Sequence, residues 1–581
     1  WGGAAPSGGR RPGGREVSVE GAGPRPYKIP SLITTPQHRP GFKNWRQKLA
    51  KQGIWKMKFG AVEGGGCSDS EALREVGLQG MMRRLVEDPE AWYAALYNTP
   101  LRPYQLEVAK GFERLIDDCR SGRSGPETGL AIMSRQAGKN ETSARLEVRL
   151  LAKYARLGGQ IVKGAPTARP QLVMSKRRLK RALKTPLTTG AWSAEEGYIF
   201  HLGEASIIFL SGEPQAQRHG ETADIALILD EFQLIDGEVF NRDFKPMTMS
   251  TGAPTLAWGT VWNLDTLLEQ TREFLRERQK KVGRKLLFEV PWWVVAESVP
   301  RYGQAVEAEI ARLGMDHPII QTQYCLRALQ SSGRFFEPRH LESMRGDFPR
   351  RHGPQAGKVY VAGVDLAGSD EEDPVSRFQM ARDRERDSIV VTIAELSWTR
   401  DRLPVLRVVD FLYLPGLHPD ACRQELMNYL FAVWRVVSVT VDARGVGDAL
   451  ASMLKRARPQ SVTALRSTIE DVSKIAFSLL GAAGTGRLKV FQDDGSEESR
   501  QFWIQCGELR RELTPGGKIR FKAPDRKQVV AGSSETVHDD FPKSLGYTVH
   551  AAQDHLYSYH EGAFFDSQPV EQWQEGEHGY W

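Results

Sequence analysis

Residues 128–143 read TGLAIMSRQAGKNETS, and the organisation of the chain can be predicted outward from them. An apolar run at 130–133 leads into a short loop that ends in Gly138-Lys139, and the segment 141–157, rich in Glu, Ala, Arg and Leu, then predicts a helix. A strand, a tight loop with Gly-Lys and a helix are the layout of a phosphate-binding loop. The loop amides and the helix N-terminus hold a polyphosphate, and the lysine adds a fixed positive charge.

The loop departs from the consensus G-x-x-x-x-G-K-[ST] at two positions. Met133 stands where the first glycine belongs, and Asn140 stands where the hydroxyl that binds magnesium belongs. Taken alone, the loop also fits an ordinary strand-to-helix turn with a solvated lysine. The residues that we expect to contact ATP are Ser134, Arg135, Gln136, Ala137, Gly138, Lys139 and Asn140.

A second apolar run, at 225–229, ends in Asp230-Glu231. Such a run describes a buried parallel strand whose tip delivers two carboxylates to the edge of a sheet. Beside a phosphate-binding loop, Asp230 is expected to hold Mg²⁺, usually through water, and Glu231 to orient and deprotonate the attacking water. Solvated acids at a strand end are common, but a Gly-Lys loop followed by this strand is far more specific and predicts an ATPase.

Three further residues are candidates for the nucleotide site. Pro103 suits the first turn of a helix, in which the ring of Tyr104 could stack on adenine and the amide of Gln105 could read the base edge. The alternative is a surface Gln beside a buried Tyr. Thr260, at the tip of a strand predicted over 255–262, could sense the γ-phosphate and couple its loss to the next segment.

The flanking segments predict accessory parts of this domain. The basic region 159–187, which includes Lys163, could contact phosphates, although such a run is often a solvated helix face. A helix at 265–282, a strand at 285–295 and a helix at 303–313 are expected to form a small lid.

A second set of acids follows residue 358. The segment 359–365 predicts a strand that carries Asp365, and 436–441 predicts a strand that closes on Asp442. Between them we expect the second and third strands of an antiparallel meander and a helix; alternating helices and strands follow, and a late helix opens at 538–540. In the ribonuclease-H-like order the first and fourth strands are neighbours, so these acids would face each other.

The late helix would bring Asp539 or Asp540 to the same place. Clustered carboxylates without nearby cations are costly, so the cluster favours divalent metal, Mg²⁺ or Mn²⁺ and as many as two ions, for phosphodiester cleavage. The alternative for each aspartate is a strand end or a helix cap, and Asp539 or Asp540 could be an N-cap. The predicted metal ligands are Asp365, Asp442, Asp539 and Asp540, and the acids expected to be catalytic are Asp365, Asp442 and Asp540.

Composition narrows the class of protein. The 581 residues carry a net charge of +7, but residues 1–58 alone hold twelve Lys/Arg against Glu16 and Glu20, so the rest of the chain is close to neutral. A basic arm favours a polyanion such as nucleic acid, or is a solvated tail. We find no apolar run of membrane-spanning length and no signal-peptide core, and expect no export. The five scattered cysteines favour a reducing compartment and make a zinc site improbable.

A phosphate-binding-loop ATPase followed by a ribonuclease-H-like nuclease resembles the large terminase subunit of tailed bacteriophages, over about residues 100–560. In that family the loop often lacks its first glycine, and Arg135 matches a basic residue that would steady the γ-phosphate. Asn140 departs from the family pattern; Thr142 or Ser143 could substitute, or Asn140 could coordinate through its amide oxygen. The resemblance rests on PYQ at 103–105, SRQAGK at 134–139, ILDE at 228–231, AWGT at 257–260, GVDLAG at 363–368, VDARGVG at 441–447 and HDD at 538–540.

The resemblance implies an α/β protein that drives double-stranded DNA into a procapsid with ATP and Mg²⁺ and cuts concatemeric DNA. Its partners would be the portal protein, a small terminase subunit and further copies of itself in a ring, expected to be a pentamer, in the host cytoplasm and not on a membrane. The predicted parts are a disordered basic arm (1–41), a helical segment (42–99), a RecA-like ATPase domain with a lid (100–345), a linker (346–358), the nuclease domain (359–565) and a tail (566–581).

Two alternatives stay open at this point. A cellular helicase-nuclease would carry a second RecA-like lobe, and no pattern for one follows Thr260. A catalytically decayed prophage assembly protein would dock without turnover, and Asn140 is the feature that points to it.

Overall fold

The structure is a computed structural model that describes residues 85–561, apart from 214–219, 331, 367–387, 415–418, 444–446, 515–516, 525–527, 531–532 and 536. The predicted arm 1–41, the tail 566–581 and residues 42–84 of the predicted helical segment lie outside the described residues. Within that segment, α3 (Pro89–Leu96) is a helix with Asp88 as its N-cap. The cysteines whose side chains are described, Cys119, Cys325 and Cys506, are free thiols.

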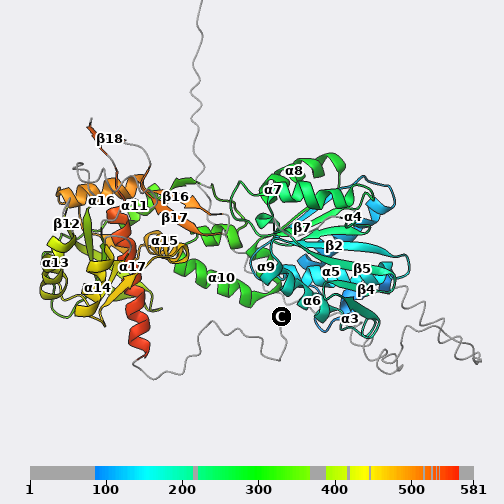
Figure 1. Cartoon of the computed structure of the whole chain (residues 1–581), viewed down its shortest axis with the longest axis horizontal. Coiled ribbons are helices and arrows are strands. Elements are labelled where there is room, and N and C mark those ends of the chain that lie inside the picture. Colours follow the sequence, from blue (N-terminus) through cyan, green and yellow to red (C-terminus); the bar gives the residue numbers. More distant parts are fainter. Residues whose placement is uncertain are drawn as a thin grey trace, which may run out of the picture. The chain divides into compact units, whose positions relative to one another are not determined.

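Eight strands form the first sheet, in the order β3-β4-β5-β2-β6-β7-β1-β8 (Figure 1). β1 lies between β7 and β8 and is parallel to both, and β6 lies between β2 and β7 and is parallel to both. The loop after β1 and the acids after β6 therefore leave the sheet at the same edge, one strand apart. The strands are β1 (Thr128–Met133), β2 (Gly159–Ala165), β3 (Trp192–Glu195), β4 (Ile199–Leu202), β5 (Ala205–Ser211), β6 (Ala226–Leu229), β7 (Thr255–Gly259) and β8 (Leu287–Val290).

Helices pack on this sheet through apolar side chains. The ring of Phe112 meets the rings of Trp258 on β7 and Phe288 on β8 edge to face, with centroids 5.0 and 5.6 Å apart. Burying each such ring contributes roughly 2–3 kcal/mol. The helices are α4 (Pro103–Arg120), α5 (Lys139–Tyr154), η2 (Ala168–Leu172), α6 (Val173–Ala182), η3 (Phe232–Leu234), α7 (Gly237–Val239), η4 (Phe240–Phe244), η5 (Lys245–Thr248), α8 (Leu267–Val282), α9 (Trp292–Ser298), α10 (Pro300–Leu313) and η6 (Ile320–Tyr324).

Three predictions for this part of the chain are wrong. The strand predicted at 285–295 ends at Val290, because Pro291 has no N–H for a ladder bond and instead caps α9. β8 also pairs with β1, so it belongs to the main sheet and not to a lid. Lys163, predicted in a basic region open to phosphates or solvent, lies on β2 and is 1% exposed.

The second sheet has the order β14-β13-β10-β11-β12-β15. β10, β11 and β12 form the predicted antiparallel meander, and β13 returns parallel to β10. The first and fourth strands of this half are thus neighbours, and the ribonuclease-H-like order is confirmed. The strands are β10 (Val359–Asp365), β11 (Ile389–Trp398), β12 (Pro404–Leu414), β13 (Ser438–Asp442), β14 (Val462–Leu465) and β15 (Leu488–Val490).

The remaining elements surround this sheet. β9 (Ser332–Arg334), β16 (Arg510–Leu513) and β17 (Ile519–Lys522) form a three-stranded sheet, and β18 (Gln528–Val530) pairs with β19 (Ser533–Glu535). The helices are α11 (Pro338–Met344), α13 (Pro419–Met427), η7 (Asn428–Val433), α14 (Gly447–Ala457), α15 (Ile469–Gly484), α16 (Glu497–Glu508) and α17 (Asp540–Glu561).

α17, red in Figure 1, packs directly on β10. A Cβ atom at Gly363 would lie 2.1 Å from the carbonyl oxygen of Ser544 and 2.3 Å from the amide nitrogen of Thr548. The hydroxyl of Ser544 donates to the carbonyl of Gly363 at 2.9 Å. Helix backbone therefore meets strand backbone, and a glycine makes the approach possible.

The segment predicted as a linker, 346–358, is bonded to the second sheet. The amide of Gly346 donates to the carbonyl of Val490 at 2.7 Å, and Arg350 pairs with buried Asp410 at 2.7 Å. The exact boundaries of the domains stay predictions.

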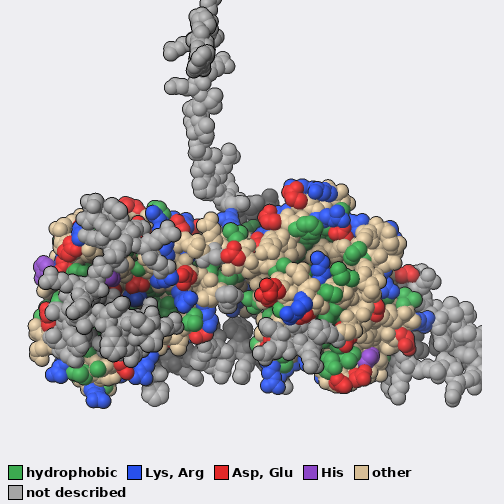
Figure 2. All heavy atoms as spheres, turned by 45° about the horizontal axis from the view of Figure 1, so that its top comes forward, with side chains coloured by type: hydrophobic (Ala, Val, Ile, Leu, Met, Phe, Trp, Pro, Cys, Tyr) green, Lys and Arg blue, Asp and Glu red, His purple; other side chains and the backbone are tan. Residues whose placement is uncertain are grey.

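Charges on the described residues are mixed. On the face shown in Figure 2, Lys and Arg side chains are interspersed with Asp and Glu. None of the helices described between 85 and 561 has the length and apolar character of a membrane span.

Candidate nucleotide and metal sites

The loop between β1 and α5 presents backbone amides at the start of the helix. Gly138 caps α5 with φ 86° and ψ 22°, and its first turn has no side-chain cap. Gln136 also has a positive φ, 60°, which is uncommon for a residue with a Cβ atom. The first amides of α5 are consequently oriented to receive an anion.

Two of the predicted ATPase side chains meet at this edge of the first sheet. The Nζ atom of Lys139 lies 2.6 Å from Oε1 of Glu231, and the two side chains are 11% and 25% exposed. Residues 92 positions apart in the sequence are in contact because only β7 separates β1 from β6.

The carboxylate of Asp230 is bound by buried side chains of α6 and β2. Its Oδ2 accepts a hydrogen bond from the hydroxyl of Ser175 at 2.7 Å and lies 2.9 Å from Nζ of Lys163. Lys163 also lies 2.6 Å from Oε1 of Glu147. Burial alone would raise the pKa of Asp230, but the Lys163 ammonium and the Ser175 hydroxyl hold it below its usual range. The same network raises the pKa of Lys163 although burial opposes this.

Two buried oxygens at this site fit a magnesium ion. Oδ1 of Asp230 and Oδ1 of Asn140 are inaccessible to solvent and accept no hydrogen bond from the described residues. The hydroxyl of Thr142 donates to the carbonyl of Gly138, and that of Ser143 donates to Glu147. Of the candidates for the direct ligand, Asn140 is the one whose buried side-chain oxygen has no hydrogen bond with the described residues, and carboxylate and amide oxygens suit Mg²⁺.

Tyr104 and Gln105 support the phosphate-binding loop through hydrogen bonds to its backbone. The Tyr104 hydroxyl and the Gln105 amide both donate to the carbonyl of Ala137 at 3.1 Å. Oε1 of Gln105 accepts from the amide of Arg102 at 3.0 Å, so both ends of its side-chain amide are engaged by backbone. Contact with adenine stays a prediction for this pair, because the structure accounts for both residues as supports of the loop.

The sequence did not predict two contacts that α10 and η6 make with the phosphate-binding loop. The Tyr302 hydroxyl, on α10, donates to the carbonyl of Arg135 at 2.8 Å, and the amide of Arg135 donates to the carbonyl of Gln323 at 2.8 Å. The Arg135 side chain is exposed, and its action on the γ-phosphate stays a prediction.

The predicted nuclease acids lie at the ends of neighbouring strands. Val364 is in register with Val441, which places Asp365 and Asp442 side by side, each at the last position of its strand. Asp540 is the first residue of α17. Burial raises the pKa of Asp365 well above its usual range, and the charges of Asp540 and Asp442 raise it further.

One lysine lies among these acids. Lys543 opposes the rise in the pKa of Asp365 and lies 2.8 Å from Asp539. Asp539 also accepts the amide of Ala523, and Asp442 accepts the hydroxyl of Tyr547 at 2.9 Å.

As placed, no three Asp, Glu, His or Cys side chains in the described part of the chain converge closely enough to hold a metal ion. The donor set of oxygens and its excess negative charge nevertheless suit hard divalent ions.

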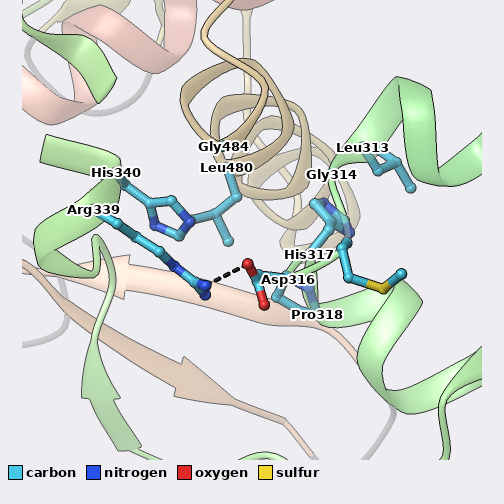
Figure 3. Close-up of a pocket in the computed structure, with 10 residues that line it drawn as sticks. Leu313, Gly314, Asp316, His317, Pro318, Arg339, His340, Leu480 and Gly484 are labelled. Atoms are coloured by element: carbon cyan, nitrogen blue, oxygen red, sulfur yellow. Dashed lines mark hydrogen bonds and ion pairs between the residues drawn. The ribbon is translucent and has the colours of Figure 1, made fainter. Parts of the chain in front are cut away.

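A cavity of about 120 Å³ lies away from these acids, between α15, α11 and the loop after α10 (Figure 3). Asp316 and Arg339 form an ion pair at its wall. His317 donates from Nε2 to the carbonyl of Phe477 at 3.0 Å and accepts the amide of Ile319 at Nδ1. Burial lowers the pKa of His317 to about 4, so the ring is neutral at physiological pH and serves packing.

No protein-family model matches the sequence, and no curated protein matches it. Solved structures do match. The structural neighbours of this chain are large terminases.

The large terminase of a thermophilic bacteriophage, in complex with ADP, is 12% identical, with a TM-score of 0.42, and the match covers 78% of this chain and 100% of that chain. The large terminase of bacteriophage HK97 is 14% identical, with a TM-score of 0.33, over 81% of this chain and 99% of that one. The large terminase nuclease of thermophilic phage G20c with bound magnesium is 15% identical, with a TM-score of 0.26, over 37% and 96%. At these identities the likeness to terminases concerns the fold, and the roles of residues rest on the geometry of this chain.

Proposed function

We propose that this chain is the large subunit of a viral DNA-packaging motor. It would hydrolyse ATP to move double-stranded DNA into a procapsid and cut concatemeric DNA with a separate metal-dependent nuclease site. The observation that carries the proposal is the contact of Lys139 with Glu231, since it joins a phosphate-binding loop to a catalytic carboxylate. The paired strand ends at Asp365 and Asp442 support the second activity.

In the ATPase site, Lys139 leaves Glu231 for the phosphates of the nucleotide, which frees the carboxylate of Glu231 to orient and deprotonate water. Asp230 and Asn140 are the residues that would hold Mg²⁺, since each has a buried oxygen that accepts no hydrogen bond from described residues. Bound Mg²⁺ would supply charge neutralisation of the β- and γ-phosphates. Lys163 keeps Asp230 ionised for that task.

In the nuclease site, Asp365, Asp442 and Asp540 would hold Mg²⁺ or Mn²⁺, as many as two ions. Asp539 is the weaker candidate ligand because Lys543 and Ala523 already engage its carboxylate. Bound metal would activate water and stabilise the leaving oxygen of the phosphodiester.

The partners follow from the family resemblance. Double-stranded DNA, a portal protein, a small terminase subunit and a pentameric ring of this chain are the assembly in which both activities would operate. The basic residues 1–58 suit DNA as a salt-sensitive contact.

A DNA-dependent ATPase assay tests the proposal. Wild type should hydrolyse ATP, and Glu231→Gln should lower kcat at least about a hundredfold because the general base is lost. Plasmid cleavage in Mn²⁺ should persist in Glu231→Gln and serves as the control for folding. Absence of turnover in wild type, with or without DNA, would refute the motor and favour a decayed assembly protein.

A further inference from the structure

The backbone at Glu231 is in an unusual conformation. Its φ of 49° and ψ of 47° lie in the left-handed region, which is unfavourable for a residue with a Cβ atom. The turn leads at once into η3, and this reversal places the side chain of Gln233 back beside the acid two positions before it. The strain therefore brings an amide to the proposed general base.

The side-chain amide of Gln233 has both ends in use. Its Nε2 donates to Oε2 of Glu231 at 2.8 Å, and its Oε1 accepts the backbone amide of Thr260 at 3.1 Å. An amide donates only through nitrogen and accepts only through oxygen, so the two partners fix its orientation. One side chain thus links the carboxylate to the residue that follows β7.

The end of β7 leaves space for this link. A Cβ atom at Gly259 would lie 2.8 Å from Oε1 of Gln233 and 2.2 Å from Cδ1 of Leu268. The backbone at Gly259 does not require a positive φ, so space and not conformation favours glycine here.

Thr260 connects the link to the phosphate-binding loop. Its hydroxyl donates to the carbonyl of Met133, the last residue of β1, at 3.3 Å. Glu231 is meanwhile held at Oε1 by Lys139. When Lys139 binds phosphate instead, the Glu231 carboxylate keeps the hydrogen bond from Gln233, which still orients it.

We propose that Gln233 is a positioning residue for ATP hydrolysis, which aims the Glu231 carboxylate according to the position of the β7 tip at Thr260. The inference rests on the proposed ATPase function. Because the amide is neutral, it orients Glu231 without neutralising it, and the base keeps its charge. A movement of the Thr260 backbone would move the Gln233 side chain and so reorient the Glu231 carboxylate. The position of the β7 tip would thereby affect the rate of hydrolysis.

The test compares Gln233→Met with wild type in steady-state ATPase assays and in equilibrium binding of a fluorescent ADP analogue. Loss of one hydrogen bond to a charged group should lower kcat about tenfold, while the Kd of the analogue stays within about twofold. Gln279→Met is the matched control. It removes an amide whose Oε1 accepts from the backbone amides of Leu286 and Leu287, near the C-terminal end of α8, and should leave kcat unchanged.

Gly259→Ala gives an independent disturbance of the same link. It should lower kcat as well, and combining it with Gln233→Met should add little, because both variants remove the same contact. If a thermal melt shows that Gln233→Met is not folded, Gln233→Glu takes its place. This variant keeps the shape of the side chain and replaces the Nε2 donor with an oxygen acceptor.

Wild-type kcat in the Gln233 variant, or an effect confined to nucleotide affinity, would overturn the inference. A wild type without turnover would instead refute the proposed function, so the two failures are distinguishable.

Discussion

The two acidic sites of the molecule differ in how their charges are balanced. At the edge of the first sheet, Glu231 is paired with Lys139 and Asp230 with Lys163, each through a contact below 3 Å. At the edge of the second sheet, Lys543 is paired with Asp539 and acts electrostatically on Asp365, whose other charged neighbours are aspartates. The first site carries its own counter-charges, and the second has more acid than base.

The pKa directions express this difference. Burial would raise the pKa of both Asp230 and Asp365, yet Lys163 lowers that of Asp230, whereas the neighbouring aspartates raise that of Asp365 further. The comparison predicts that the acids of the proposed ATPase site are ionised before any metal binds, and that those of the proposed nuclease site need a cation nearby to be ionised together.

The largest expected effect breaks the nuclease side of the comparison. Asp365→Asn removes a proposed metal ligand, so Mn²⁺-dependent plasmid cleavage should fall at least about a hundredfold. The ATPase rate should stay at the wild-type level, because the acids of that site are separate. Asp401→Asn, at an exposed turn, is the control. Loss of both activities in Asp365→Asn would contradict two independent sites.

Removing a counter-charge tests the ATPase side. Lys163→Met leaves Glu147 and Asp230 buried without their ammonium and should lower the free energy of unfolding by about 3–5 kcal/mol. Denaturant titration followed by tryptophan fluorescence measures the change. Lys280→Met, which removes an exposed lysine paired with Glu277, should cost less than about 1 kcal/mol. Equal losses in the two variants would show that the Lys163 network is not a buried charge balance.

The smallest expected effect concerns metal alone. Without nucleotide, Mn²⁺ at about ten times its Kd should stabilise wild type by about 1.4 kcal/mol, through relief of repulsion among the nuclease acids. A thermal melt with and without Mn²⁺ reads this as a rise in Tm. The rise should disappear in Asp365→Asn and persist in Glu231→Gln. A rise in Tm that is lost in Glu231→Gln and kept in Asp365→Asn would contradict Mn²⁺ binding by the acids around Asp365.

The sequence predicted those features that depend on local pattern. Apolar runs ending in Asp230-Glu231, Asp365 and Asp442 identified strands whose tips carry acids, and the order of the strands placed the last two side by side. Parallel strands bring their ends to one edge, so the pattern and topology together were sufficient.

The features that the sequence did not predict depend on three-dimensional neighbours. Lys163 was grouped with a basic region, although its place between apolar residues of a strand was a sign that it would need a buried acid. Gln233 gave no sign in the sequence, since its role arises from a left-handed turn at Glu231 and from space beside Gly259. The strand predicted at 285–295 runs into the first residues of the Trp292–Ser298 helix, because the apolar residues there outweigh the signal from Pro291.

The contact of α17 with Gly363 has a practical consequence. A methyl group at this position would meet helix backbone, which cannot rotate aside as a side chain can, so the helix itself would have to lift from the strand. Asp540 begins that helix and Asp365 ends that strand two positions after Gly363, so lifting the helix would also move Asp540 relative to Asp365. Gly363→Ala would accordingly be a means of silencing DNA cleavage while every carboxylate stays in the chain.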